Sequence, residues 1–224
     1  MKTSYTLTVL AFLVTPAGAW GASEMTSDEQ KFSYAVGFQI GQNLSREGLK
    51  LDAEALSQAI RDAVSGADPK ITAEEMRAAV EQYRQRAADE LAAEADANLK
   101  ASQAFMEENK GKPGVMETAS GLQYKVLTEG SGKQPSEADT VVVHYRGTLL
   151  NGDEFDSSYE RQEPATLPLN GVIKGWQEAL PLMSEGAKWE LYIPAELAYG
   201  ERGAGSRIGP NQALVFEVEL IEVK

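Results

Sequence analysis

A carboxylate beside an aromatic ring is the pair of residues in this chain best suited to chemistry. Phe155 and Asp156 follow a hydrophobic segment, residues 140–150, and the turn-forming pair Asn151-Gly152. Asn-Gly between two hydrophobic runs favours a tight hairpin, so we expect both side chains on its second strand. Burying a carboxylate costs free energy unless another group pairs with it. Asp156 therefore lies either in a hydrated loop or in a pocket built around it.

The chain offers few other catalytic groups. It contains one histidine, His144, and no cysteine, which excludes thiol nucleophiles, zinc–thiolate centres and disulfides. A Ser-His-Asp triad would have to use His144, which alternates with Val143 and Tyr145 in a strand pattern. The Gly-x-Ser-x-Gly sequence of a nucleophile elbow is missing. We therefore expect His144 to be structural, and we expect the protein to use no metal and no cofactor.

Composition narrows the range of partners. The chain has 224 residues and a formal net charge of −13. Such a charge argues against a nucleic-acid partner, because phosphates attract a basic surface. The sequence has no apolar stretch long enough for a membrane span, which takes about 20 residues.

The first residues have the pattern of a secretory signal peptide. Lys2 precedes an apolar run at residues 5–14, and Pro16 and the small residues 17–19 follow it. We expect residues 1–19 to be removed, with cleavage one to three residues later as the alternative. The pattern predicts export to a periplasm or cell envelope, and a chain without cysteine suits an oxidising compartment.

Residues 23–70 are predicted to form a helical dimerisation region. Ser27 and Gln30 have the spacing of a capping box, and Asp52 and Gly66 bound a second helix. Apolar residues recur every four positions on one face of the first helix, namely Phe32, Val36, Ile40 and Leu44. So small a region buries little core alone, and we expect it to pair with a second copy. Two glycines in the first helix fit either internal packing or a self-association seam; these are Gly37 and Gly41.

A long linking helix is predicted for residues 71–111. Thr72 and Glu75 have capping-box spacing, and no helix breaker occurs before Gly111. The middle of this segment is rich in alanine and charged residues, with Leu91 almost alone among large apolar side chains. We expect an exposed link between two bodies, since a coiled coil needs a sustained heptad of large residues.

Residues 118–224 have the pattern of a domain rich in strands. Strands are predicted at 122–126, 140–150, 188–193 and 213–223, with one short helix starting near Gly175. The predicted fold class is α+β: an all-helical N-terminal region with a long linking helix, then a twisted antiparallel sheet wrapped around one short helix. The aromatic and apolar residues of this domain form either a simple core or a concave pocket for a small ligand.

Several motifs in this domain resemble those of the FKBP-type peptidyl-prolyl cis-trans isomerases. The resemblance covers about residues 120–224 and rests on Val-His-Tyr-x-Gly-x-Leu at 143–149, Gly-x-x-Phe-Asp-Ser-Ser at 152–158, Val-Ile-x-Gly-Trp at 172–176, Leu-Ala-Tyr-Gly at 197–200 and Leu-Val-Phe-x-Val-Glu-Leu at 214–220. The helical segment ahead of it resembles the N-terminal dimerisation region of the bacterial macrophage-infectivity-potentiator and FkpA-like branch.

The resemblance implies a set of site residues. The catalytic ones would be Asp156, Tyr199 and Phe216, and the substrate-binding ones Tyr145, Phe155, Arg161, Val172, Ile173, Trp176 and Ile208. The proline ring would rest on Trp176. The backbone N–H of Ile173 and the hydroxyl of Tyr199 would donate to substrate carbonyls. Asp156, held by Tyr145 and Arg161, would face the twisting carbonyl.

The resemblance also implies an activity and its partners. The protein would accelerate isomerisation of X-Pro bonds while exported proteins fold, by non-covalent catalysis in an apolar pocket and together with chaperone activity. Its partners would be proline-containing segments of unfolded or exported proteins, a second copy bound through the N-terminal helices, and macrolide inhibitors of the FK506 and rapamycin class. A holdase without catalysis is the competing hypothesis. The chain departs from the family pattern at Ala165 and Leu167, where an aromatic ring is common, and at Gly209, where a proline is common.

Overall fold

A computed structural model of the protein describes residues 25–46 and 48–224. The predicted signal peptide at 1–19 lies outside this range. Helix α1 spans Asp28–Arg46 and belongs to a unit that ends at Leu51, while residues from Asp52 onward form a second unit. The predicted capping box at the start of α1 is confirmed, because Gln30 donates its backbone N–H to Ser27 Oγ and accepts from the Ser27 N–H, both at 3.2 Å. Gly48 follows the helix with φ of 70°.

The second unit begins with two helices, and each starts at the position predicted from its capping residue. Helix α2 spans Ala53–Ser65, and the side chain of Asp52 accepts hydrogen bonds from two N–H groups of its first turn. Gly66 ends α2 in the left-handed conformation that glycine tolerates best. Helix α3 spans Ala73–Asn109, and Thr72 and Glu75 form the reciprocal capping box expected from their spacing.

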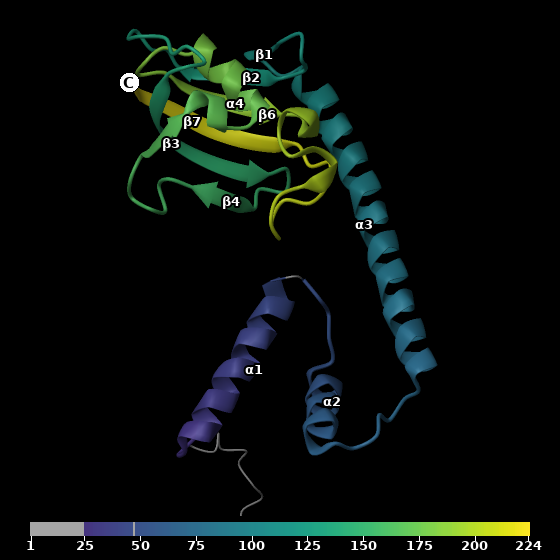
Figure 1. Ribbon diagram of the computed structural model, residues 1–224. Helices are drawn as coiled ribbons and strands as arrows, with labels where there is room; N and C mark the ends of the chain where they lie inside the picture. The colour runs from purple at the N-terminus through teal and green to yellow at the C-terminus, as the bar shows by residue number, and fades with distance from the viewer. Residues whose placement is uncertain (1–24, 47) are drawn as a thin grey trace, which may run out of the picture. The chain divides into compact units, whose positions relative to one another are not determined.

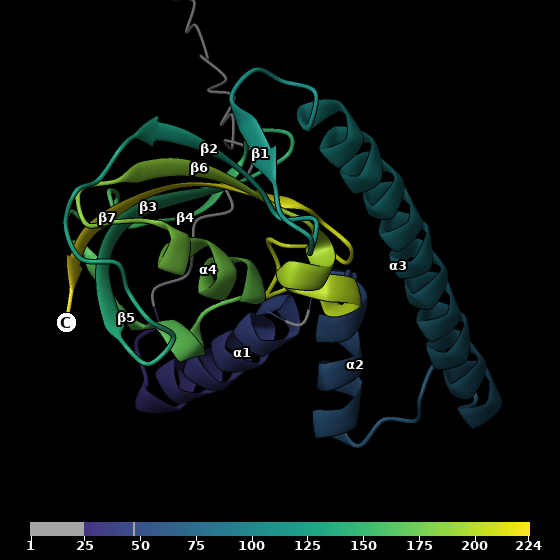
Figure 2. The same cartoon turned by 90° about the horizontal axis from the view of Figure 1, so that it is seen from above.

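The rest of the chain forms an antiparallel sheet that curves around a short helix (Figures 1 and 2). The strands run in the order β1-β2-β6-β7-β3-β4, with β5 also paired to β3. Their bounds are β1 Val115–Glu117, β2 Gln123–Thr128, β3 Thr140–Leu149, β4 Glu154–Ser157, β5 Ala165–Pro168, β6 Lys188–Ile193 and β7 Leu214–Val223. Helix α4 spans Lys174–Ala179 and lies in the concave face of the sheet (Figure 2). The predicted fold class is confirmed.

The core lies between α4 and the inner face of the sheet. Strand β7 alternates buried and half-buried residues, as the sequence pattern predicted for a strand with one buried face. Five apolar residues of β6 and β7 are fully buried in this core, namely Leu191, Ile193, Leu214, Val218 and Leu220.

Two strands of the sheet have no counterpart in the sequence prediction. Strand β1 is three residues long and pairs with β2, so the sheet begins at Val115, before residue 118. Strand β5 is four residues long and pairs with the first half of β3. Neither strand is long enough to display a period of two, which is why no pattern predicted them.

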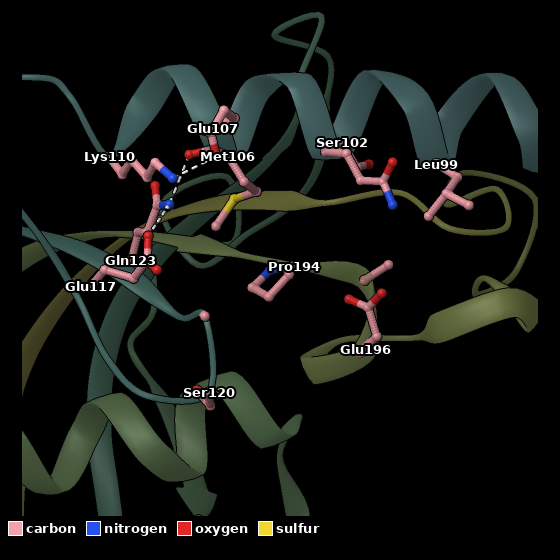
Figure 3. A pocket seen from close by; sticks show the side chains of 13 residues that line it. Leu99, Ser102, Met106, Glu107, Lys110, Glu117, Ser120, Gln123, Pro194 and Glu196 are labelled. Carbon is pink, nitrogen blue, oxygen red and sulfur yellow. Dashed lines mark hydrogen bonds and ion pairs between the residues drawn. The ribbon is translucent and has the colours of Figure 1, made fainter.

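The two ends of α3 have different surroundings. Leu91 in the middle of the helix is 56% exposed, as expected for a helix on which little packs. The last turns instead contact the sheet: the Phe105 and Tyr192 rings lie 5.9 Å apart, and buried Asn109 donates to Gln123 Oε1 at 3.0 Å. Figure 3 shows Leu99 and Met106 projecting from this part of α3 toward the strands and Pro194. The predicted exposed link therefore describes the middle of α3 and not its C-terminal end.

Candidate active site

A pocket of about 360 Å³ opens on the concave side of the sheet. The side chains and backbone that line it come from β3, β4, β5, the start of α4 and β7, and from the short segment after β6. They are Tyr145, Phe155, Asp156, Leu167, Gly171, Val172, Ile173, Trp176, Tyr199 and Phe216. Nine of these ten residues are apolar, aromatic or glycine, so the pocket is an apolar cavity with one carboxylate.

Four aromatic rings form the floor and walls of the pocket. Trp176, on α4, is only 3% exposed, and the rings of Tyr145 and Phe216 meet it edge-on with centroids 5.3 Å away in each case. Phe155 meets Phe216 edge-on at 5.5 Å. These are the edge-to-face geometries that aromatic quadrupoles favour. The cluster fixes the pocket's shape, because moving one ring displaces its neighbours.

A glycine lets the rings come this close to the sheet. A Cβ placed on Gly147 of β3 would lie 2.7 Å from both Phe155 and Phe216. Contacts this short are not tolerated in packed proteins, so any larger residue would push the two rings into the pocket. Steric crowding by these two rings therefore explains why the Val-His-Tyr-x-Gly motif has glycine at this position.

The carboxylate of Asp156 is held by two donors. The Tyr145 hydroxyl donates to Asp156 Oδ2 at 2.5 Å, and Arg161 Nη1 donates to Asp156 Oδ1 at 2.6 Å. Arg161 Nη2 also donates to the Tyr145 hydroxyl oxygen at 2.8 Å, which closes a three-residue ring of hydrogen bonds. Of the two alternatives open for Asp156, the structure has the pocket, and Arg161 is the guanidinium partner that the family resemblance implied.

This ring of contacts sets the charge state of the site. Burial alone would raise the pKa of Asp156, but hydrogen bonds from Tyr145 and Arg161 and the guanidinium charge outweigh burial and hold that pKa below its ordinary value. Burial and the Asp156 carboxylate raise the pKa of Tyr145, although Arg161 opposes the shift. Burial, with the Asp156 charge, also raises the pKa of Tyr199. At neutral pH the site thus holds one anion beside two neutral phenols.

Hydrogen-bond donors also stand at the rim. Ile173 is the N-cap of α4, where backbone N–H groups have no partner inside the helix. The side chain of Gln177 donates to Val172 O at 2.7 Å and so fixes the turn that presents Ile173. Tyr199 is 40% exposed at the pocket edge. An amide carbonyl in the pocket has donors available on two sides.

The structure brings together most of the residues predicted for the site. Eight of the ten line the pocket, and Arg161 reaches it through Asp156 and Tyr145. Ile208 is buried in the core at 7% exposure and is not among the lining residues, so its role in binding stays a prediction. Sequence reasoning did not assign Leu167 and Gly171 to the lining. Leu167 lies on the same face of β5 as Ala165, in a four-residue strand that the sequence pattern did not predict.

His144 is paired elsewhere. Its Nδ1 lies 2.9 Å from Ser158 Oγ, and its ring stacks on Tyr159 with centroids 4.7 Å apart. Ser158 is fully buried, and its hydroxyl also accepts the backbone N–H of Tyr145 at 2.8 Å. Asp156 is meanwhile bound by Tyr145 and Arg161, so the three residues of a triad are not assembled.

The part of the chain that the structure describes contains no group of three or more His, Cys, Asp or Glu side chains placed to hold a metal ion. Within residues 25–46 and 48–224, no helix combines the length and apolar character of a membrane span.

Comparison with known proteins identifies the class that this fold and pocket define. Residues 131–221 match the family model described as FKBP-type peptidyl-prolyl cis-trans isomerase, and residues 29–126 match the model of the domain amino-terminal to it. The chain belongs to the FKBP-type peptidyl-prolyl cis-trans isomerase family.

Relatives of known name cover nearly the whole chain. It is 45% identical over 210 residues to the peptidyl-prolyl cis-trans isomerase Mip of Coxiella burnetii, covering 92% of this chain and 91% of that one. It is 40% identical over 214 residues to the outer membrane protein MIP of Legionella longbeachae, covering 94% and 92%. The crystal structure of FkpA from Escherichia coli matches with a TM-score of 0.64 at 37% identity, covering 88% and 97%. The predicted recognition, including its N-terminal region, is confirmed.

Proposed function

We propose that this protein accelerates cis-trans isomerisation of X-Pro bonds in exported proteins as they fold, and that it also acts as a chaperone. One observation carries the proposal: in a chain of this family, an apolar pocket with a tryptophan floor holds a single carboxylate, fixed by a phenol and a guanidinium. The pocket volume suits a proline ring and its flanking amides.

The chemistry of the reaction fits such a pocket. An X-Pro amide must lose conjugation to rotate, which makes the uncatalysed step take tens of seconds. The planar amide is more polar than the twisted one. An apolar pocket therefore destabilises the ground state more than the transition state and lowers the barrier. This route needs no nucleophile, metal or cofactor.

We assign the roles of individual residues within this proposal. The proline ring rests on Trp176, and Tyr145, Phe155, Val172 and Phe216 form the walls around it. The Ile173 N–H and the Tyr199 hydroxyl donate to carbonyls of the bound segment. Asp156 faces the twisting carbonyl carbon, while Arg161 keeps the carboxylate ionised and in place. Macrolides of the FK506 and rapamycin class, which fill this kind of pocket, are expected to inhibit the protein.

Self-association through the N-terminal helices is part of the proposal. Four large apolar residues on α1 are between 40% and 70% exposed, namely Phe32, Val36, Phe38 and Ile40. A second feature supports it: residues of α2 and the start of α3 line an apolar cavity of about 530 Å³. A monomer that leaves such surfaces in water gains from covering them with a second copy. We propose a homodimer whose two arms hold unfolded chains.

The proposed compartment is the periplasm or cell envelope. The signal-peptide pattern at 1–19 supports it, as does the name of the Legionella longbeachae relative, an outer membrane protein. Cell fractionation after expression of the full chain, with N-terminal sequencing of the product, tests both points. An unprocessed cytoplasmic product would contradict them.

Refolding of a protein whose slow phase is limited by a trans-to-cis X-Pro bond tests the function. Catalytic amounts of the full chain should speed that phase, and molar amounts should suppress aggregation of a substrate without prolines. Ile40→Asp, on the apolar face of α1, should abolish dimers in sedimentation equilibrium and weaken suppression, whereas Gln42→Asp, which adds the same charge away from that face, should do neither. An unchanged slow phase with intact suppression would favour the holdase alternative.

A further inference from the structure

The segment that connects Tyr199 to β7 is fastened to α3. We call residues 200–213 the pocket loop; both views show it beside the C-terminal half of α3 (Figures 1 and 2). Ser102 of α3 is only 5% exposed, and both of its hydroxyl hydrogen bonds go to this loop: it donates to Asn211 O at 2.9 Å and accepts from the Ala213 N–H at 2.8 Å. Asn98, one turn earlier, donates to Pro210 O at 2.9 Å.

Asn211 links these contacts to the pocket. Its carbonyl accepts from Ser102, and its side-chain amide donates to Ala95 O of α3 at 3.4 Å. It adopts φ of 56°, a left-handed conformation that asparagine tolerates better than most residues. Its backbone N–H donates to Gly200 O at 2.9 Å, and Gly200 directly follows Tyr199. A continuous series of hydrogen bonds thus runs from α3 to the residue beside Tyr199.

The pocket loop is internally stiff, so a restraint at one end reaches the other. Ala204 and Ile208 exchange backbone hydrogen bonds at 2.8 and 3.2 Å. Gly203 makes this narrow hairpin possible: it has φ of 63°, and a Cβ there would lie 2.2 Å from Ile208 O. At the tip, Arg207 Nη1 donates to Phe155 O at 3.0 Å. The loop therefore touches the pocket twice, beside Tyr199 and behind Phe155.

We propose that Asn98 and Ser102 are positioning residues of the isomerase pocket. By holding Asn211 and Pro210 they fix the pocket loop, and the loop sets where Tyr199 stands at the rim. The C-terminal half of α3 then helps to determine the geometry of the binding site. The inference rests on the proposed function, because it takes the Tyr199 hydroxyl to be a donor to the bound segment.

The test uses the full chain and three variants: Asn98→Ala, Ser102→Ala and the control Gln103→Ala, which alters the next, exposed position of the same helix. KM and kcat are measured with a short X-Pro peptide. Loosening a donor that holds substrate and transition state alike should raise KM about three- to tenfold, the effect of one net hydrogen bond, and leave kcat within about twofold. Amide hydrogen exchange at Asn211 and Ala213 should quicken in Ser102→Ala while β7 stays protected.

The outcomes separate this inference from the function on which it rests. A wild-type chain without isomerase activity would refute both. An active wild type whose KM is unchanged in Asn98→Ala and Ser102→Ala, or whose kcat falls at constant KM, would refute the positioning role alone. If Ser102→Ala fails to fold by circular dichroism, Asn98→Ala decides, since it leaves the Ser102 hydrogen bonds in place. Gln103→Ala must match wild type in every measurement.

Discussion

The Tyr145 hydroxyl donates to the Asp156 carboxylate at 2.5 Å, across the neighbouring strands β3 and β4. Arg161 binds both residues and completes the ring. A carboxylate that two donors already orient needs little reorganisation when charge shifts on a bound amide. In the proposed mechanism, desolvation in the aromatic pocket supplies much of the rate, while Asp156 orients the substrate and tunes the site.

Removing the charge of Asp156 tests that division of roles. Asp156→Asn keeps the shape of the side chain and the Tyr145 hydrogen bond, but it loses the attraction to Arg161. We expect kcat/KM to fall roughly three- to tenfold, the effect of about 0.5–1.5 kcal/mol, with folding intact by circular dichroism. Glu160→Gln, a charge change four residues away, is the control and should leave kcat/KM unchanged. A thousandfold loss would instead make Asp156 the main source of catalysis.

Arg161 governs the pH range of the site. The lowered pKa of Asp156 means that the folded state binds fewer protons near pH 4 than the unfolded state. The stability from this group is therefore present above the ordinary aspartate pKa, about 3.9, and is lost as pH falls through the lower folded value. Activity should stay constant from about pH 5 to 8 and decline in acid.

Arg161→Gln should move that decline to higher pH, because burial of Asp156 remains while the guanidinium is gone. Carboxyl NMR titration of Asp156 measures the shift directly. Arg146→Gln is the matched control, since Arg146 pairs with Glu154 and not with Asp156. An Asp156 titration that is the same in wild type and Arg161→Gln would refute the assigned cause.

Gly147→Ala should damage the pocket by steric displacement. The added methyl group meets Phe155 and Phe216 at 2.7 Å, and overpacking of this kind costs about 1–3 kcal/mol. The displaced rings should lower kcat/KM by roughly ten- to hundredfold, since misplacement near 1 Å has effects of that size. In Gly111→Ala the methyl group meets its nearest neighbour at 3.5 Å, an ordinary contact, so both quantities should stay near wild type. Equal activity of the two variants would show that the ring positions do not matter.

Gly209 stands where the family often has proline, and the structure gives a reason. Its N–H donates to Gln212 Oε1 at 2.8 Å, a bond that proline cannot make. Gly209→Pro should lower the free energy of unfolding by about 1 kcal/mol, measured by urea denaturation. Gly209→Ala keeps the N–H, and its methyl group, like the proline ring, meets the end of the Glu94 side chain and the Asn98 amide nitrogen. Its loss should therefore be smaller than that of Gly209→Pro by the contribution of the hydrogen bond. If Gly209→Pro is as stable as wild type, the hydrogen bond to Gln212 does not explain why this chain has glycine in place of proline.

Features marked by a local pattern could be predicted from the sequence. The Asn151-Gly152 turn places β3 against β4 with Gly147 opposite Asp156, which brings the Tyr145 hydroxyl within hydrogen-bond distance of the Asp156 carboxylate. The family motifs name most of the pocket lining. The caps of α2 and α3 follow from Asp52 and Thr72, whose side chains accept the first free N–H groups of each helix.

Features that depend on distant segments left no local pattern. From the sequence, Ser102 and Asn98 are simply polar residues on a helix expected to be exposed. Their hydrogen-bond partners lie more than 100 positions away, at 210–213. No spacing rule connects such sites, because only tertiary packing brings them together. The short strands β1 and β5 were missed for a related reason: their pairing partners, and not their own residues, make them strands.

The central claim is that the pocket itself accelerates X-Pro rotation. NMR exchange spectroscopy on a short peptide containing one X-Pro bond measures the cis-trans rate at equilibrium, without a coupled protease. The full chain should raise that rate many-fold over buffer, Phe216→Ala should remove most of the gain, and an FK506-class macrolide should abolish it. A cis-trans rate in the presence of the folded wild-type chain equal to the rate in buffer would contradict the account.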